Sequence, residues 1–368
     1  MKRILPAILL LSVLLASCTQ GADLLATVTT TEAVTSGTAV STDRLDEQNP
    51  TTTPPVTTPP PITESIPVFG DVDLGDVDRD DRTVVYTAEK TKLYRENGEV
   101  LARMEAGKAL IELARTADYA VILYKDTLCL TYPHLLTAEV PDEAQERMDT
   151  LGGIYYPGGD LLVAIDAGHQ GKAMKDKEPL GPGSTEMKAM VSTGTQGVST
   201  RIAERELNLQ VSLLLRDELI SRGYSVVMIR ESHEVTISNV QRAKVANAYG
   251  ADAFIRIHAN GSEDRSVRGA MTICQTPENP YNGSLYAESR RLSDCILDKY
   301  CITSGIQKNN VWETDTMTGI NWAETPVTIV EMGYMSNVEE DELMATDAFR
   351  RSAAIGIANG LDAYFATE

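Results

Sequence analysis

The chain has 368 residues, of which 42% are hydrophobic. That is enough for two domains, because a domain usually takes about 100–200 residues. Its 33 basic and 53 acidic residues give a formal net charge of −20, which argues against a protein that binds nucleic acid through a basic surface. The five cysteines are too few for a disulfide framework.

Residues 1–18 have the composition of an export signal. Lys2 and Arg3 precede an apolar stretch at 4–15, which is shorter than the roughly 20 apolar residues that span a bilayer. The stretch ends in Leu15-Ala16-Ser17-Cys18, which resembles the bacterial lipobox. The resemblance implies that Cys18 is lipidated, begins the mature chain and anchors it to the membrane. The alternative is an ordinary secretory signal with a chance cysteine. We expect a lipoprotein outside the cytoplasm that faces the cell wall.

Residues 19–82 are rich in Thr, Pro and Asp, with near-repeats at 51–55 and 57–61. Such a segment has too little apolar surface to offset its ordering entropy, and its prolines favour an extended spacer. We therefore predict a disordered tether. The acidic run at 71–78 lacks the Gly and the Glu that an EF-hand loop requires at its sixth and twelfth positions, so we expect a solvated linker there.

Residues 83–140 have the pattern of a small all-β module. The predicted strands, which polar turns separate, are 83–86, 92–94, 109–113 and 119–124. Their spacing indicates a barrel. The order resembles bacterial SH3-like domains, including the turn Asn97-Gly98 before a strand. The resemblance implies wall or peptide binding, and a spacer barrel is the alternative. We predict a linker at 141–160.

From residue 161 to 368, strands and helices alternate, which predicts one α/β domain with a mostly parallel central sheet flanked by helices. We expect Asn239 to cap a helix N-terminus. The predicted strands are 161–165, 224–229, 253–257, 269–273 and 327–330. The predicted helices are 204–222, 240–249, 284–304 and 347–366.

Three polar side chains follow strands of this predicted sheet. His169, His258 and Glu331 come directly or closely after apolar runs, and the carboxyl ends of parallel strands form the binding crevice of such sheets. Glu204 begins the first long helix, where the helix dipole favours a carboxylate. Two His and one Glu make a catalytic zinc set, and a further carboxylate near the metal-bound water would act as general base.

Each of these residues also has an ordinary structural role open to it. A histidine at a strand end is often a hydrogen-bonded structural residue. Glu204 can simply stabilise the helix N-terminus, a role for which Glu206 competes, and Glu331 can be a surface acid. Spacing alone therefore leaves a metal site and a purely structural arrangement both open.

Residues 161–366 resemble the zinc-dependent N-acetylmuramoyl-L-alanine amidases of type 3, which hydrolyse peptidoglycan. The matching blocks, in order along the chain, are 165–169, 204–209, 226–230, 242–247, 257–260 and 326–337. The resemblance implies that His169, Glu204 and His258 bind one zinc ion and that Glu331 is the catalytic carboxylate. Glu204 is chosen over Glu206 because it stands four residues before Asn208, as in the family.

Within the blocks, Asn260, Arg230 and Asp166 are candidates for contacts to the substrate or to the metal ligands. For Asp166 we expect turn formation instead, despite its closeness to His169. The resemblance implies cleavage of the amide between N-acetylmuramic acid and L-alanine of the stem peptide, with peptidoglycan as partner and no nucleic acid. The sequence does not identify a protein activator.

The segment 170–203 departs from the family, because it is long and polar. Long loops beside active sites are often lids or binding loops, and our hypothesis is that this segment shapes the substrate groove or limits access to the zinc. Arg256 stands where many relatives carry a small polar residue, and we expect it to adjust the sheet surface. His233 either faces the substrate or lies in an exposed loop, whereas His134 is expected to be structural. We expect Cys295 and Cys301 not to form a disulfide, because they lie on different faces of one predicted helix.

Two other functions share these features. A zinc peptidase acting on the stem peptide would use the same metal and cut a different bond. A catalytically inactive wall-binding lipoprotein would keep the fold, but all four expected zinc and catalytic positions are filled, which argues against it.

Overall fold

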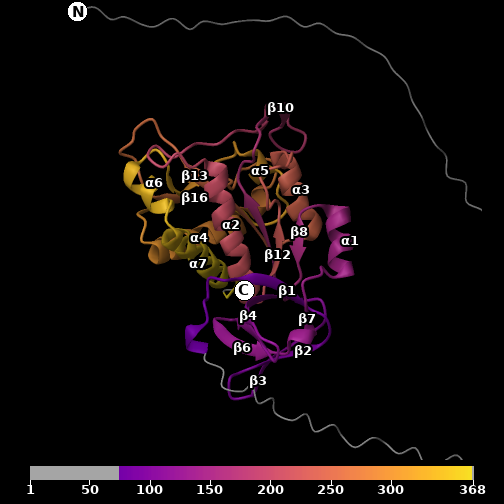
Figure 1. Ribbon diagram of the computed structural model, residues 1–368. Helices are drawn as coiled ribbons and strands as arrows, with labels where there is room; N and C mark the ends of the chain where they lie inside the picture. Colours follow the sequence, from indigo (N-terminus) through magenta and orange to yellow (C-terminus); the bar gives the residue numbers. More distant parts are fainter. Residues whose placement is uncertain (1–73, 367–368) are drawn as a thin grey trace, which may run out of the picture. The chain divides into compact units, whose positions relative to one another are not determined.

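The structure is a computed structural model that describes residues 74–366 (Figure 1). The predicted export signal, Cys18 and most of the predicted tether lie outside the described residues. Between residues 74 and 366, every helix is either too short or too polar to cross a membrane.

The predicted β module forms one antiparallel sheet of seven strands, in the order β3-β2-β6-β5-β4-β1-β7. A short helix, η1 (Leu74–Asp76), precedes it. The hairpin between β2 and β3 turns at Asn97-Gly98, where Gly98 has a φ of 81°, a conformation that glycine adopts at little cost. The strands predicted at 83–124 are present, and the SH3-like character of the module stays a prediction. The elements are β1 (Thr83–Thr87), β2 (Thr91–Tyr94), β3 (Val100–Met104), β4 (Ala109–Arg115), β5 (Ala120–Tyr124), β6 (Thr127–Thr131), η2 (Pro133–Leu135) and β7 (Leu136–Thr137).

The segment predicted as a linker is instead structured. It contains α1 (Asp142–Leu151) and β8 (Ile154–Tyr156). β8 pairs antiparallel with β12 and forms one edge of the main sheet. The acids Asp142 and Glu143 in the first helical turn, and Gly152 with a φ of 76° after the last, are ordinary helix boundary signals.

The main sheet has seven strands in the order β15-β14-β16-β13-β9-β12-β8. Four of its pairs are parallel, and the pairs β14–β16 and β8–β12 are antiparallel, so the predicted mostly parallel sheet is confirmed. Its central strands are apolar along almost their whole length because both faces are covered. The strands are β9 (Leu162–Ala167), β12 (Ser225–Met228), β13 (Ala253–Asn260), β14 (Ala270–Cys274), β15 (Lys308–Glu313) and β16 (Val327–Tyr334).

Helices cover both faces of this sheet (Figure 1), and alternate residues of each strand pack against the helices on opposite faces. One face packs on α2 (Glu204–Ser221), α4 (Tyr286–Ser304) and α7 (Asp347–Phe365) through strand residues such as Ile165 and Ile257. The other face packs on α3 and α5 through residues such as Ala164 and Phe254. The remaining helices are α3 (Asn239–Tyr249), η3 (Gly283–Leu285), α5 (Thr318–Asn321) and α6 (Val338–Met344).

The N-cap of α3 is Ser238, so the prediction of Asn239 is wrong. The Ser238 hydroxyl accepts from the Gln241 amide at 3.2 Å, and the Gln241 side chain accepts from the Ser238 amide at 2.8 Å. This reciprocal capping box satisfies two backbone donors. Asn239 is therefore the first helical residue, and its side chain is free to contact other elements.

The long segment after His169 folds as a hairpin, not as an irregular loop. Strands β10 (Met174–Pro179) and β11 (Met187–Val191) pair with each other in a separate antiparallel sheet. Glu178 fastens the hairpin to α3, because its carboxylate accepts from the Val240 amide at the helix N-terminus at 3.2 Å.

The β module shares a hydrophobic core with the α/β domain. Ile111 and Leu123 belong to the same buried cluster as Leu215 and Leu219 of α2. A backbone bond of 2.6 Å joins the Lys125 amide to the Ser221 carbonyl at the C-terminal end of α2. The module is thus packed against the helix whose first residue is Glu204.

Candidate metal centre

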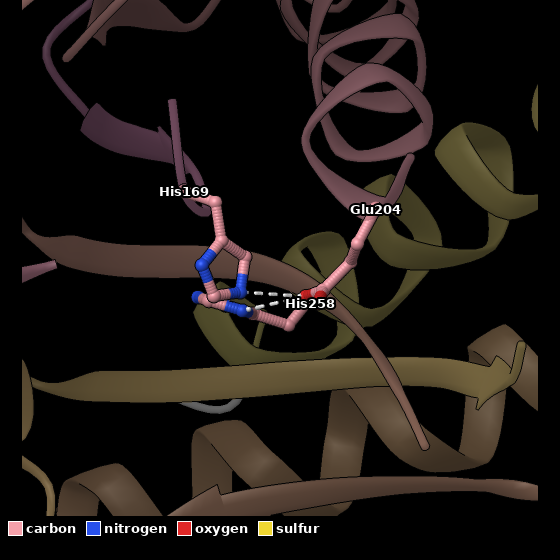
Figure 2. Close-up of side chains that lie close together, drawn as sticks. All are labelled: His169, Glu204 and His258. Atoms are coloured by element: carbon pink, nitrogen blue, oxygen red, sulfur yellow. Dashed lines mark hydrogen bonds and ion pairs between the residues drawn. The ribbon is translucent and has the colours of Figure 1, made fainter. Parts of the chain in front are cut away.

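Three predicted ligand residues from three different elements meet at one point (Figure 2). Glu204 Oε1 lies 2.9 Å from His169 Nε2 and 3.1 Å from His258 Nδ1. One nitrogen of each imidazole and one carboxylate oxygen all lie within 4.8 Å of one another. The structure therefore brings together the two histidines of the strand-end argument and the glutamate that opens the first long helix.

The backbone around these ligands is unusual. His169 follows β9 with a φ of 61°, a left-handed conformation that non-glycine residues seldom adopt. Gly168 lies under the ring of His258, and a Cβ at this position would be 2.3 Å from His258 Cε1. His258 lies within β13, which runs to Asn260, and not after the strand as predicted.

Two buried arginines hold the backbone that carries His169. Arg230 donates to the carbonyls of Ala167 at 2.7 Å and Gly168 at 3.0 Å. Arg242 donates to the carbonyls of Ala167 and His169, both at 3.0 Å. Arg230 is 1% exposed. Its contacts are with the backbone that carries the ligand residue His169.

Asp166 forms a buried ion pair, and the prediction that it forms a turn is wrong. It lies inside β9 with 0% exposure. Its carboxylate accepts from Arg242 at 2.5 Å and from Arg256 at 2.9 Å. Burial would raise the pKa of Asp166, but the two guanidinium groups hold this pKa below its usual value. Arg256 is accordingly 4% exposed and paired with Asp166, and it does not modify an exposed sheet surface.

The stretch after the hairpin orients two of the three ligands, which sequence reasoning did not foresee. His169 Nδ1 lies 3.0 Å from the Ser192 carbonyl, which leaves Nε2 directed at Glu204. Glu204 Oε2 accepts from the Thr195 amide at 2.8 Å. Such outer contacts fix the tautomer and orientation of metal ligands. Nothing local in the sequence links Ser192 to His169, which is 23 residues away, and Thr195 precedes Glu204 by nine residues. Asn208, four residues on, donates to Glu204 Oε1 at 3.3 Å.

The donor set suits a divalent metal such as zinc, for which two imidazoles and one carboxylate are a catalytic combination. His258 Nε2 is buried and has no hydrogen-bond partner between residues 74 and 366. Burial lowers the pKa of His258 to about 4, so the ring is neutral at pH 7, the form that binds metals. Burial opposes ionisation of Glu204, yet the two histidines hold its pKa well below 4.5. His258 and Glu204 are thus in the protonation states that bind a metal.

Glu331 is the further carboxylate of the site. It lies inside β16, directly beside His258 in the strand register. Its Oε2 is buried without a hydrogen-bond partner in the described part of the chain. Burial, followed by the charge of Glu204, raises the pKa of Glu331 to about 8, against the opposing charge of Arg256.

The three clustered ligand residues and Glu331 line a cleft of about 710 Å³. Asn260 lines it as well, and so do Lys188, Ala189 and Val191 of the hairpin. His233 is not among the lining residues; its carbonyl accepts from the Gly171 amide at 2.9 Å.

The residues expected to play no part in the chemistry lie away from the cleft. His134 stacks on Tyr132 in the β module, with ring centroids 5.7 Å apart. Cys129, Cys274, Cys295 and Cys301 are free thiols.

Comparison with known proteins gives one family. The family model described as N-acetylmuramoyl-L-alanine amidase matches residues 163–363. The Bacillus subtilis protein YqiI, whose function is uncharacterised, is 28% identical over 204 residues, which are 55% of this chain and 84% of YqiI. The N-acetylmuramoyl-L-alanine amidase Rv3717 of Mycobacterium tuberculosis is 27% identical over 218 residues, with 56% of this chain and 88% of Rv3717 covered.

The fold is similar to that of solved N-acetylmuramyl-L-alanine amidase structures. The apo structure of the N-acetylmuramyl-L-alanine amidase Ami1 from Mycobacterium abscessus aligns with a TM-score of 0.51 at 23% identity, covering 56% of this chain and 99% of that one. Ami1 from Mycobacterium smegmatis gives the same score at 24% identity, covering 57% and 99%. Both likenesses concern the α/β fold.

Proposed function

Because the chain belongs to the N-acetylmuramoyl-L-alanine amidase family, it is a peptidoglycan hydrolase, and we propose that it works with a zinc ion held by His169, Glu204 and His258. The bond cut joins N-acetylmuramic acid to the L-alanine of the stem peptide. The observation that carries the proposal is the meeting of three metal-binding side chains and Glu331 in one cleft inside the matched region.

This amide is unactivated, so its hydrolysis needs a strong nucleophile and a stabilised oxyanion. Bound zinc supplies both, by lowering the pKa of a water molecule to about 7 and polarising the scissile carbonyl. The chain's own residues do the rest: Ser192 and Thr195 orient the ligands, and Arg230 and Arg242 hold the backbone at His169.

Glu331 acts as the proton carrier. It accepts a proton from the attacking water and passes it to the departing L-alanine nitrogen, a role typically worth roughly 10²–10⁴-fold in rate. A carboxyl with a raised pKa suits both halves of this task, because it is neither too weak a base nor too weak an acid near neutral pH.

The surroundings of the site have proposed roles too. Asn260 contacts the substrate from the cleft wall, and the β10–β11 hairpin forms a second wall that shapes the groove. Deleting residues 175–198 should therefore change the rate of wall hydrolysis, and an unchanged rate would show that the hairpin has no part in it.

The N-terminal regions determine where the enzyme acts. A lipid on Cys18 anchors the chain outside the cytoplasm, residues 19–82 act as a tether towards the cell wall, and the β module, if SH3-like in function, binds wall or peptide.

The test uses residues 19–368, with and without zinc, incubated with purified peptidoglycan. Mass spectrometry identifies the released ends. New L-alanine amino termini that vanish with chelator and with Glu331→Gln support the proposal. New termini elsewhere in the stem would indicate a peptidase. Binding to the wall without any release would indicate an inactive wall-binding protein.

A further inference from the structure

The cleft has a positively charged side next to its metal centre. Lys188 and Arg256 are the lysine and arginine side chains that line it in the described part of the chain. We propose that Arg256 and Lys188 form a carboxylate-binding subsite that selects stem peptides with a free carboxylate on the residue after L-alanine. This inference rests on the proposed function, because it names the substrate class of the same cleft.

Arg256 offers one side of its guanidinium to the cleft. Its Nε donates to Asp166 at 2.9 Å and its Nη2 to Asn239 at 2.8 Å. Its Nη1 has no hydrogen-bond partner among residues 74–366, and yet it is not one of the fully buried unpartnered atoms. Nη1 lies against Gly319, where a Cβ would be only 2.2 Å away. Gly319 lines the cleft, and because it has no Cβ, Arg256 Nη1 can occupy the space beside it.

Lys188 approaches the same part of the cleft from the hairpin. Its Nζ donates to the Thr316 carbonyl at 2.6 Å, and Thr316 stands three residues before Gly319. Asn239, which accepts from Arg256, also donates to the Met190 carbonyl of the same hairpin strand at 2.5 Å. The two cations therefore contact the same segment, 316–319.

The buried charged side chains near the metal centre do not balance one another. Three arginines, Arg230, Arg242 and Arg256, are buried at 1%, 1% and 4% exposure, and Asp166 is the one buried carboxylate that pairs with any of them among the described residues. Backbone carbonyls and amide oxygens accept from most of the other donors without neutralising them, and Arg256 Nη1 is left over. Excess positive charge in a poorly solvated wall favours an anion in the adjoining cleft. The buried charge near the cleft is thus positive, although the whole chain has a net charge of −20.

The acids that line the cleft are Glu204, Glu263 and Glu331. Glu204 and Glu331 belong to the metal centre, and Glu263 lies on the exposed stretch after β13 ends. Arg256 lies two residues before His258 on the same face of β13. That separation is about 7 Å along a strand, which matches two residue steps of an extended peptide, the distance from the scissile carbonyl across L-alanine to the residue that follows it.

A carboxylate is the occupant that this chemistry recognises. Guanidinium groups bind carboxylates through charge-assisted hydrogen bonds, and Arg is better suited than Lys to that planar geometry. With the scissile carbonyl at the metal centre, L-alanine leads towards Arg256, so the carboxylate of the following residue reaches Nη1 and Lys188 Nζ.

The test compares two soluble substrates that differ in one group. Both are N-acetylmuramoyl-L-alanyl peptides; the residue after L-alanine carries a free carboxylate in one and the isosteric carboxamide in the other. Zinc-loaded wild-type protein should cleave the carboxylate with at least about tenfold higher kcat/KM, the effect of one charged hydrogen bond. Arg256→Gln should bring the ratio to within about threefold, mainly through KM.

Lys188→Gln is the second variant, because Lys188 lies on the hairpin surface and its loss does not threaten the core. It should lower the ratio by several-fold. Lys177→Gln is the matched control, an exposed lysine on the same hairpin outside the cleft lining, and it should keep the wild-type ratio.

Equal cleavage of both substrates by the wild type would overturn the subsite, as would unchanged ratios in folded, zinc-loaded Arg256→Gln and Lys188→Gln. Failure of the proposed function looks different, because then neither substrate is cleaved at the L-alanine amide at all.

Discussion

The two ends of α2 use charge in opposite ways. At the C-terminal end, Glu218 accepts from Arg82 at 3.1 Å and from Arg222 at 2.7 Å, and Arg222 also pairs with Asp362. At the N-terminal end, Glu204 gathers two histidines, while His258 Nε2 and Glu331 Oε2 nearby stay buried without partners in the described structure.

This difference separates stability from chemistry on a single helix. At the C-terminal end the charged side chains are paired, and the core shared with the β module lies beside them. This end therefore holds the β module and the α/β domain together. Incomplete pairing at the N-terminal end costs free energy unless a ligand completes it. Changes at the two ends should therefore have different consequences.

The largest effect is expected at the N-terminal end. Glu204→Gln removes the carboxylate ligand, and we expect zinc content to fall to background and hydrolysis to drop by about 10³-fold or more. Glu218→Gln, four turns along the same helix, is the matched control and should keep its zinc. Metal analysis of both purified variants checks this, and equal zinc content in the two would break the comparison.

Glu331→Gln should separate metal binding from proton transfer. Because Glu331 is not one of the three clustered ligands, we expect zinc to be retained while kcat falls roughly 10²–10⁴-fold. Zinc content and steady-state kinetics measured on the same preparation decide the point. A variant that keeps wild-type kcat would remove Glu331 from the mechanism.

Ile111→Ala tests the other end. Ile111 is fully buried in the core that the β module shares with α2, so truncation should cost about 2–5 kcal/mol of unfolding free energy. Urea unfolding measures this loss, and zinc content should stay at the wild-type level. If zinc were lost from the folded variant, the two ends would not be independent.

A further effect is a pH dependence of the unfolding free energy in the metal-free protein. The pKa of Glu331 is raised from 4.5 to about 8, so between these values the native state binds more protons than the unfolded state. Its contribution to stability therefore falls as pH rises through this window. Relative to wild type, Glu331→Gln should gain up to about 4 kcal/mol between pH 5 and pH 8.5, because the window covers about three pH units at about 1.4 kcal/mol each. Urea unfolding of both proteins at the two pH values measures it, and a constant difference would contradict the raised pKa.

The ligands were predictable because each is set by local sequence. His169 and His258 stand at or near the ends of apolar runs, which strand topology brings to one edge. Glu204 opens an amphipathic helix, and the family resemblance singled it out as the third ligand. The role of Asp166 was not predictable, because its partners Arg242 and Arg256 lie 76 and 90 residues away. Ser192 and Thr195 reach the ligands only because the hairpin turns the chain back, which polar composition did not reveal.

The segment 141–160 was missed for another reason. Its strand β8 has three residues and becomes a strand by pairing with β12, so its identity depends on tertiary contact.

The most direct test of the central claim is zinc X-ray absorption spectroscopy on residues 19–368 loaded with one equivalent of zinc. The account predicts nitrogen and oxygen neighbours at about 2.0–2.2 Å with the signature of two imidazoles, and loss of one imidazole in His258→Ala. A shell of sulfur neighbours near 2.3 Å, or an unchanged spectrum in His258→Ala, would contradict it.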